Sequence, residues 1–481
     1  MNVRRLLLPT TTGLKFAASW LVVKTDTSYT LLHASMKRNL LTLLFLLATL
    51  SAAAQKRKGA KAAVGLQVSA VTVGRVVNTL AADDMQGRGT GQPGGLKAAQ
   101  FLAAEFQRIG LQPLPGSTGF EQTFNVYQTR PGPLSVTLNG RVLASGQVVA
   151  MSGQPTLTWT SEDAQPPVVV VVGPAPAERQ KLNALVRPTA NTLVLVDTAH
   201  AKQFGYLANY LGHGTTSAEP PGPYSAVFVL AVAPTAPTYR VSAATTVRPV
   251  ELRNIVGLLP GRDPARSKEN VVFSGHYDHL GVVKPVAGDS IANGADDDAS
   301  GTTAVVALAE YFKQRNDNAR PLVFTAFAAE EVGGFGAQHF SRQLDPNQVV
   351  AMFNIEMIGK VAKFGPNTAF ITGYEKSDFG KLLQANLEGS KFRFEPDPYP
   401  QQNLFYRSDN ATLAKLGVPA HTISSDQIPD DKLYHTVDDE VASLNLPNMT
   451  AIIQAIAQSA TGIVAGRQTP TRIAPEAANG R

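Results

Sequence analysis

The sequence predicts an α/β protein with a mixed, mostly parallel central sheet, helices on both faces of that sheet, and an inserted β-rich lobe. Three observations favour this class. From residue 254 onward, short apolar runs alternate with amphipathic helical segments, the pattern of strand–helix units. Between about residues 130 and 249 the composition shifts to Pro, Thr, Val and Ala with short β-like runs. The 481 residues, 44% of them apolar, are enough for a sizeable core.

The composition excludes several classes of protein. The chain has no cysteine, which excludes a disulfide scaffold, a cysteine nucleophile, an iron–sulfur cluster and a cysteine-ligated zinc site. The net charge of +6 comes mostly from residues 1–54, which hold six basic residues and one acid. The remaining chain is close to neutral, so the charge gives no support for a nucleic-acid partner.

Residues 36–55 have the three parts of a secretory signal. Two basic residues follow Met36, residues 40–50 form a short apolar run, and three alanines end at Ala54. We expect cleavage after Ala54, export to the periplasm or the medium, and no stable membrane anchor afterwards. The alternative is an uncleaved anchor, although the apolar run is short for a bilayer. Because signals stand at the N-terminus, we expect Met36 to be the true start, with residues 1–54 as leader and signal.

The first part of the main domain is expected at residues 68–129, after a basic linker at residues 55–67. Apolar residues at helical spacing predict helices over 68–82 and 98–109. A glycine-rich segment at 87–95 lies between them and predicts a turn-rich loop.

The rest of the chain divides into three regions. The lobe takes residues 130–249, with β-like runs at 167–172, 192–197 and 226–231 and no residues that suggest chemistry. The second part of the main domain takes residues 250–466, and a loose tail takes residues 467–481. In the second part, strands are expected at 270–275, 322–327, 349–355, 368–372 and 418–423, and helices at 300–315, 335–343 and 446–464.

Acidic residues or histidines follow directly after the predicted strands of the main domain. In open α/β sheets, sites gather at the carboxyl ends of strands. Histidine and carboxylate ligands suit a catalytic zinc ion with an open position, and two ions that share a carboxylate need at least two histidines and three carboxylates. The chain supplies that set: His276, Asp297, Glu331, Glu356 and His435. Glu330 is left over beside Glu331, where a general base is required.

Each of these residues also has an ordinary structural explanation. His276 could be a core histidine, the aspartates around Asp297 could cap the following helix, and the glutamate pair could be solvated. The set is harder to dismiss, because its members stand in order at strand ends. The other histidines lack such a context, and we expect them to be structural: His33, His200, His213, His279, His339 and His421.

The motifs in combination resemble a known family. Gly87-Arg-Gly-Thr-Gly91 looks like its N-terminal signature, and residues 254–261 look like its entry strand. The site motifs are His276-Tyr-Asp278, Gly-Ala-Asp-Asp297-Asp-Ala-Ser-Gly, Ala-Glu330-Glu331-Val-Gly and Tyr434-His435-Thr. Over residues 80–124 and 253–464 the chain resembles the two-zinc aminopeptidases of the aminopeptidase S and Y type, metallopeptidase family twenty-eight. Relatives of that family include glutamate carboxypeptidase and glutaminyl cyclases.

The resemblance implies two zinc ions and a role for each ligand. Asp297 would bridge the ions, His276 and Glu356 would complete one site, and Glu331 and His435 the other. Glu356 departs from the family, which usually has Asp at that position. A zinc exopeptidase-like fold is also implied, and related enzymes often carry a protease-associated insert where the lobe stands.

The resemblance further implies three residues in catalysis. Glu330 would act as base and then as acid, Asp278 would hold the ring of His276, and Tyr434 would stabilise the oxyanion.

The function expected from the sequence is an exported zinc exopeptidase acting on peptides, an aminopeptidase first of all. One alternative is a carboxypeptidase or dipeptidase on the same two-zinc site. Such an enzyme needs a basic pocket for the substrate carboxylate, and Arg407 is a candidate. A glutaminyl cyclase would use one zinc ion, and a degenerate binding module would have lost ligands or the base.

Overall fold

The structure is a computed structural model that describes residues 65–474. The predicted leader, signal and most of the predicted linker lie outside the described residues, as does the end of the tail from residue 475. None of the helices within residues 65–474 combines the length and apolar composition that crossing a bilayer requires.

The central sheet is mixed and mostly parallel, which confirms the predicted fold class. Its middle consists of four parallel strands: β13 (Leu322–Phe327), β10 (Asn270–His276), β14 (Val349–Ile355) and β17 (Ala420–Ser424). Beyond β17 lie β15 (Thr368–Ile371) and β16 (Arg393–Pro396); beyond β13 lie two long antiparallel strands, β9 (Tyr239–Leu259) and β1 (Glu121–Leu138). Every residue of β13 and β17 is buried, as in sheets covered on both faces.

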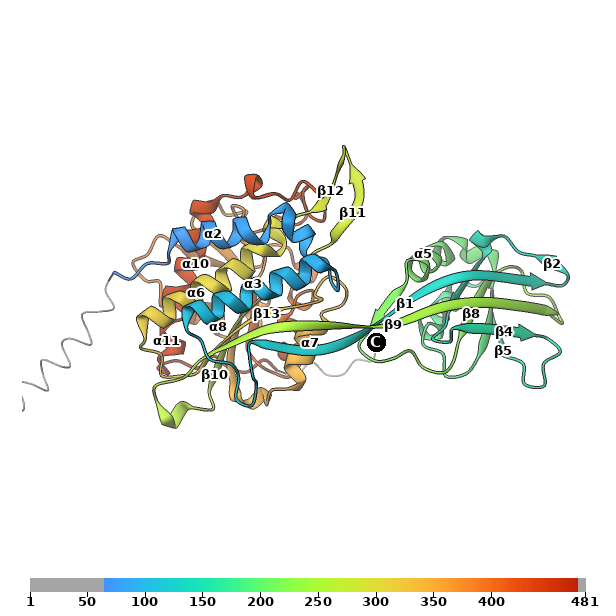
Figure 1. Cartoon of the computed structure of the whole chain (residues 1–481), viewed down its shortest axis with the longest axis horizontal. Coiled ribbons are helices and arrows are strands. Elements are labelled where there is room, and N and C mark those ends of the chain that lie inside the picture. Colours follow the sequence, from blue (N-terminus) through green and yellow to red (C-terminus); the bar gives the residue numbers. More distant parts are fainter. Residues whose placement is uncertain (1–64, 475–481) are drawn as a thin grey trace, which may run out of the picture. The chain divides into compact units, whose positions relative to one another are not determined.

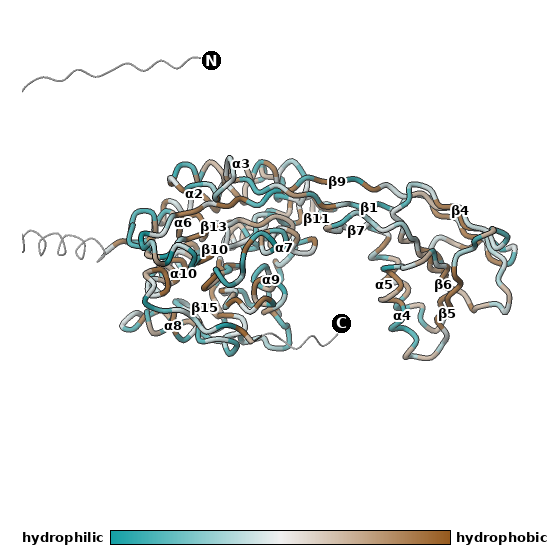
Figure 2. The backbone as a smooth tube through the Cα atoms, turned by 90° about the horizontal axis from the view of Figure 1, so that it is seen from below, coloured by the Kyte–Doolittle hydropathy of each residue, from teal (hydrophilic) through white to brown (hydrophobic). Residues whose placement is uncertain are grey.

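Helices cover both faces of this sheet. One group packs together on β10, β13 and β14 (Figure 1): α2 (Ala70–Leu80), α3 (Pro93–Ile109), α6 (Gly301–Arg315) and α10 (Leu446–Ser459). The central helix of this group is α6, which is buried along most of its length because it contacts the other three. On the other face, α7 (Phe335–Arg342) and α9 (Asn410–Ala414) pack against each other (Figure 2) and share an apolar core with the strands.

Short elements complete the main domain. A hairpin of β11 (Gly281–Val286) and β12 (Asp289–Ala292) follows β10, and α8 (Phe379–Ala385) and α11 (Thr461–Val464) both contact α10. Residues 467–474 differ from the loose tail that the sequence predicts. Arg320 donates hydrogen bonds to Gln468 and Thr469, and the side chain of Ile473 is buried.

The inserted segment forms a sheet of its own and also extends the long strands. Its four-stranded sheet has the order β3 (Val148–Met151), β8 (Ala226–Leu230), β6 (Thr192–Val196), β5 (Val168–Val172). The segment also holds two helices, α4 (Gln180–Leu185) and α5 (Ala201–Gly212), which the sequence analysis did not expect. Three short strands pair with the long ones: β2 (Arg141–Val142), β4 (Thr156–Thr160) and β7 (Thr215–Ser217).

The predicted boundaries of this segment fall inside two strands. Strands β1 and β9 pair from Glu121–Ile255 to Leu138–Tyr239, with one register shift between Pro131 and Leu134. The boundary at 129/130 therefore lies within β1 and the boundary at 249/250 within β9. Two continuous strands, rather than flexible linkers, connect the segment to the main sheet.

Candidate metal centre

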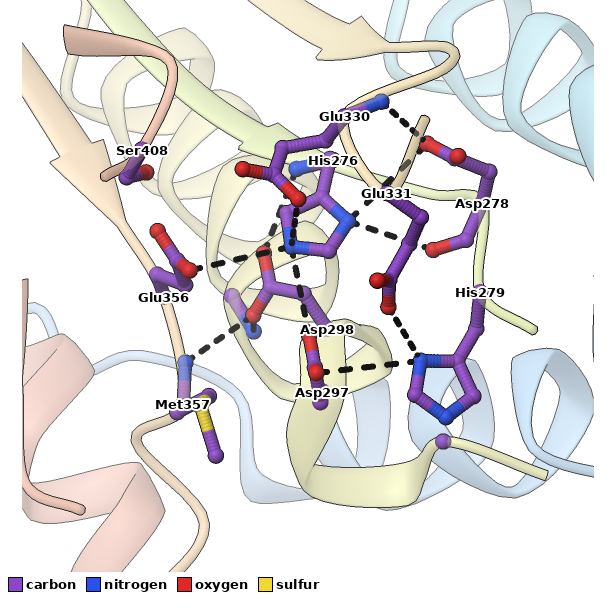
Figure 3. Close-up of polar contacts among 12 residues, drawn as sticks. His276, Asp278, His279, Asp297, Asp298, Glu330, Glu331, Glu356, Met357 and Ser408 are labelled. Atoms are coloured by element: carbon purple, nitrogen blue, oxygen red, sulfur yellow. Dashed lines mark hydrogen bonds and ion pairs between the residues drawn. The ribbon is translucent and has the colours of Figure 1, made fainter. Parts of the chain in front are cut away.

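The predicted site residues come together at the carboxyl end of the parallel strands (Figure 3). His276 is the last residue of β10, Glu330 and Glu331 follow β13, and Glu356 follows β14. Asp297 lies in the turn before α6, which begins at Gly301. A cavity of about 930 Å³ lies at this edge, and six of the predicted residues line it: Asp297, Glu330, Glu331, Glu356, Tyr434 and His435.

The carboxylate of Asp297 is the centre of the arrangement. Its Oδ1 lies 3.3 Å from Nε2 of His276, and its Oδ2 lies 3.2 Å from Nε2 of His435. Oε2 of Glu331 lies 3.2 Å from the same atom of His435, and Oε1 of Glu356 lies 4.0 Å from Nε2 of His276. The structure thus brings all five predicted metal ligands together, in two groups that share Asp297.

The spacing of these atoms suits metal ions. Zinc binds nitrogen and oxygen ligands at about 2.0–2.1 Å, so neighbouring ligand atoms of a tetrahedral site lie ~3.3 Å apart. Three of the four contacts above match that value, and the contact to Glu356 is wider. Nε2 of His276 and Oε2 of Glu356 are buried and have no hydrogen-bond partner, which is rare for buried polar atoms. The donor set therefore fits two cation sites.

The electrostatics of the cluster also favour cations. Burial lowers the pKa of His435, but hydrogen bonds with Asp297 and Glu331 raise it overall, to about 10. Burial also lowers the pKa of His276, but the nearby carboxylates of Asp297 and Glu330 hold it well above the ordinary value. Four carboxylates in one buried cluster require positive charge, which divalent ions would supply in place of protons.

Glu330 lies beside the His276 group and is the site glutamate that is not among the five predicted ligands. Its Oε2 lies 4.0 Å from Nε2 of His276, its carboxylate points into the cavity (Figure 3), and the side chain is 17% exposed. Burial raises its pKa well above the ordinary value. Such a carboxylate, beside the ligands but free of them, is placed to accept and return a proton.

Asp278 holds Glu330 as well as His276. Nδ1 of His276 donates to the backbone carbonyl of Asp278 over 3.1 Å, whereas the Asp278 carboxylate lies 3.9 Å from that nitrogen. The carboxylate instead accepts the backbone N–H of Glu330 at 3.1 Å and the hydroxyl of Thr90 at 2.6 Å. The sequence predicts that the side chain of Asp278 holds the ring of His276, whereas in the structure the ring donates to the main-chain carbonyl of Asp278.

Tyr434 lies beside His435, with ring centroids 3.9 Å apart in a stacked arrangement. Its side chain lines the cavity, and burial together with nearby carboxylates raises the pKa of its hydroxyl. The hydroxyl therefore keeps its proton and can donate a hydrogen bond.

His279 is a residue whose position the sequence analysis missed. It is wholly buried; its Nδ1 lies 2.7 Å from Oε1 of Glu331 and 3.8 Å from Oδ2 of Asp297. Its hydrogen bond holds the carboxylate whose other oxygen faces His435. The available signal was its place three residues after His276, in the same segment after the strand.

Arg88 ties together the loops that carry the ligands. Its side chain is wholly buried and donates hydrogen bonds to five backbone carbonyls: Leu80 (2.8 Å), Tyr277 (2.6 Å), Asn293 (2.5 Å), Gly294 (2.8 Å) and Asp297 (3.4 Å). Tyr277 follows His276, so this one guanidinium connects the segment after β10 to the turn around Asp297. The sequence analysis placed Arg88 in a loop and gave it no role.

Two further buried aspartates fix the backbone around the ligands. The carboxylate of Asp298 accepts the N–H groups of His276 at 3.2 Å and Met357 at 3.1 Å. The carboxylate of Asp439 accepts those of Asp296 and Asp297.

Three residues at the site have left-handed backbone that non-glycine residues seldom adopt: Ala329 (φ 63°), Met357 (φ 53°) and His435 (φ 58°). Each is a proposed ligand or the neighbour of one of the site glutamates, so some of the backbone strain in the protein lies where side chains are aimed at one point.

Together the fold and the site define an α/β protein with a metal centre of two histidines and several carboxylates at strand ends. Residues 254–460 match the family model "Peptidase family M28". The similarity to peptidase family M28 extends over this segment, which is less than half of the chain.

Two kinds of curated relatives match parts of the chain. It is 38% identical over 114 residues to a probable zinc metalloprotease of Pyrenophora teres f. teres, 23% of each chain. It is 28% identical over 214 residues to leucine aminopeptidase 1 of Pyrenophora tritici-repentis, 41% of this chain and 51% of that one. The chain thus spans about a quarter of the first relative's length and about half of the second's.

Solved structures show the same fold. An aminopeptidase from Aneurinibacillus sp. strain AM-1 is similar with a TM-score of 0.52 at 18% identity, over 85% of this chain and 97% of that one. BSAP, a zinc aminopeptidase from Bacillus subtilis, is similar with a TM-score of 0.52 at 15% identity, over 84% of this chain and 97% of that one.

Proposed function

We propose that this protein is a zinc-dependent aminopeptidase that removes N-terminal residues from peptides. The observation that carries the proposal is the carboxylate of Asp297, whose two oxygens face two separate groups of ligands, with Glu330 beside them. Relatives described as leucine aminopeptidase and as probable zinc metalloprotease support it.

Two zinc ions fit the residues present. His276, Asp297 and Glu356 would hold one ion, and Asp297, Glu331 and His435 the other. Zinc bound there would polarise the scissile carbonyl and make water a better nucleophile at neutral pH. Glu356 is longer than the aspartate usual in the family, and its contact to His276 is the widest of the set.

The side chains of the protein carry the protons. Glu330 takes a proton from the attacking water as the water oxygen bonds to the carbonyl carbon. It then delivers this proton to the leaving amine as the carbon–nitrogen bond breaks. The hydroxyl of Tyr434 donates to the oxygen that becomes negative, and Asp278 fixes the main chain of Glu330.

The charge of the site favours the amino end of a substrate. A free α-amine is positively charged at neutral pH, and the carboxylates of Glu330 and Glu356 face the cavity. An apolar stretch of the cavity wall, with Met357, Phe370 and Ile428, is suited to the N-terminal side chain.

The test is a time course of one unmodified peptide with distinguishable ends, followed by mass spectrometry on zinc-loaded protein. We expect stepwise loss from the N-terminus, abolished by N-acetylation of the peptide and by a chelator. Loss from the C-terminus would replace the proposal with a carboxypeptidase, an alternative that Arg407 supports because it lines the same cavity. No cleavage of any peptide would leave a metal site with another substrate.

We also propose that the protein is exported, on the pattern of residues 36–55. N-terminal sequencing of the mature protein should then begin at Gln55. A mature chain that begins at Met1 or Met36 would contradict cleavage after Ala54.

A further inference from the structure

The wall of the cavity at the metal centre includes basic side chains that the proposed chemistry does not use. Besides the site residues, its walls include Arg342, Arg407 and Lys415. Within residues 65–474, none of these three side chains forms an ion pair with an acid, although Lys415 lies 5.8 Å from the ring of Tyr406. Unpaired cations on the wall of a substrate cavity act as a local source of positive potential.

Two of these cations lie at the C-terminal ends of neighbouring helices: Arg342 is the last residue of α7, and Lys415 follows α9 directly. The hydroxyl of Ser341 at the end of α7 donates to that of Thr412 on α9 over 2.7 Å. Arg342 follows Ser341 directly, and Lys415 lies three residues after Thr412, on the same side of a helix. Both side chains are exposed and line the cavity. They therefore form one wall of it, defined here as the basic arm.

The other parts of the cavity already have occupants in the proposed reaction. The carboxylates of Glu330 and Glu356 face the free amine, and the apolar stretch with Met357, Phe370 and Ile428 takes the N-terminal side chain. The part of the peptide that follows the scissile bond is left for the basic arm. Because a peptide is extended by about 3.3–3.6 Å per residue, only the first few residues after that bond lie within reach.

We propose that the basic arm binds a carboxylate on the leaving side of the substrate, so that this enzyme prefers short or acidic peptides. The inference rests on the proposed aminopeptidase function. The carboxylate can come from the C-terminus of a short peptide or from an Asp or Glu side chain in the second or third position. In both cases the two cations of the basic arm attract the negative charge.

The experiment compares kcat/KM within matched pairs of peptides. The first pair is Leu-Gly-Gly with a free C-terminus and the same peptide with an amidated C-terminus. The second pair is Leu-Gly-Asp-Gly and Leu-Gly-Asn-Gly, both with an amidated C-terminus. We expect the charged member of at least one pair to be favoured about threefold to tenfold, the range that two exposed charge pairs can supply. The advantage should shrink as salt is raised, because exposed charges are screened.

A double variant, Arg342→Gln with Lys415→Gln, should abolish this preference. The matched control is Lys381→Gln with Lys391→Gln, which removes two exposed charges that do not line the cavity and should retain the preference. If the double variant changes only the first pair, the basic arm binds the C-terminal carboxylate. If it changes only the second pair, the basic arm binds the acidic side chain.

Three results would overturn the inference: equal rates within both pairs, a preference that survives the double variant, or a preference for Glu over Gln at the N-terminal position. To separate this from the proposed function, the same peptides are titrated into zinc-loaded Glu330→Gln protein by calorimetry. Tighter binding of the charged peptide there supports the inference even if no peptide is cleaved, and equal affinities contradict it.

Discussion

At the scale of single residues, the site separates the proposed proton carrier from the proposed metal ligands. Glu330 and Glu331 are neighbours in sequence, yet only Glu331 contacts both histidines, His279 and His435. We expect Glu330→Gln to lower kcat by about 10² to 10⁴, the usual contribution of a general base, with zinc content unchanged.

Glu331→Gln, in contrast, should lose zinc as well as turnover, which elemental analysis of the purified protein measures. Glu388→Gln, an exposed glutamate on the surface, is the control for both variants. A Glu330→Gln protein with normal kcat would remove this residue from the mechanism.

The environment of His421 predicts how the stability of the fold depends on pH, and this prediction is independent of the metal centre. It is buried near the start of β17, donates to the carbonyl of Thr372 and contacts the hydroxyl of Ser377. Burial lowers its pKa from 6.5 to about 4. Between these pH values the unfolded chain binds a proton that the folded protein does not, so the free energy of unfolding falls as the pH drops through this window.

The expected loss is roughly 3 kcal/mol between pH 7 and pH 4. His421→Asn keeps a donor for the Thr372 carbonyl and does not titrate. Urea unfolding of both proteins across this pH range should give a difference in stability that narrows toward acid pH. Parallel curves would show that His421 is not the group responsible.

At the scale of elements, the segment around Arg88 acts as a clamp between the loops of the metal centre. Removal of this buried guanidinium leaves several backbone carbonyls without donors, which lowers the free energy of unfolding by about 3–5 kcal/mol. We therefore expect Arg88→Gln to lower the melting temperature and zinc affinity together, measured by calorimetry and chelator competition. Arg75→Gln, an exposed partner of Glu105 on α2, is the control, and it should change neither strongly. Normal zinc affinity in Arg88→Gln would contradict the clamp.

Elements with a strong local pattern could be predicted from the sequence, and those fixed by distant pairing could not. The strand at β13 and the helices α6 and α7 were predicted within one or two residues, because apolar runs and helical spacing are local signals. The long pairing of β1 with β9 joins residues more than 100 positions apart, so no local pattern reveals it.

The same distinction holds at the site. The five proposed ligands could be expected to lie close together, because each follows a predicted strand or precedes a helix. The contact of His279 with Glu331 depends on the conformation of the segment after β10, and the hydrogen bonds of Arg88 depend on carbonyls from three separate segments. Neither arrangement can be predicted from residue type and spacing.

At the scale of the whole molecule, the metal centre joins elements from across the main domain. Its side chains come from the ends of β10, β13 and β14, from the turn before α6 and from the loop after β17. A ligand that binds only the folded state raises its free energy of unfolding, by about 4 kcal/mol at a free concentration a thousand times its dissociation constant. Zinc should therefore stabilise the complete main domain, not one loop.

We expect a chelator to lower the melting temperature of the wild-type protein and added zinc to restore it, measured by scanning calorimetry. The fall should be much smaller in Glu331→Gln, which lacks a ligand to one ion, while Glu388→Gln should respond as the wild type does. Without cations the clustered carboxylates repel one another, and Nε2 of His276 and Oε2 of Glu356 have no hydrogen-bond partner. The destabilised state should therefore also exchange amide protons faster at the strand ends than in the middle of β10. If a chelator does not change the melting temperature of active protein, the clustered carboxylates do not need metal ions for the stability of the fold.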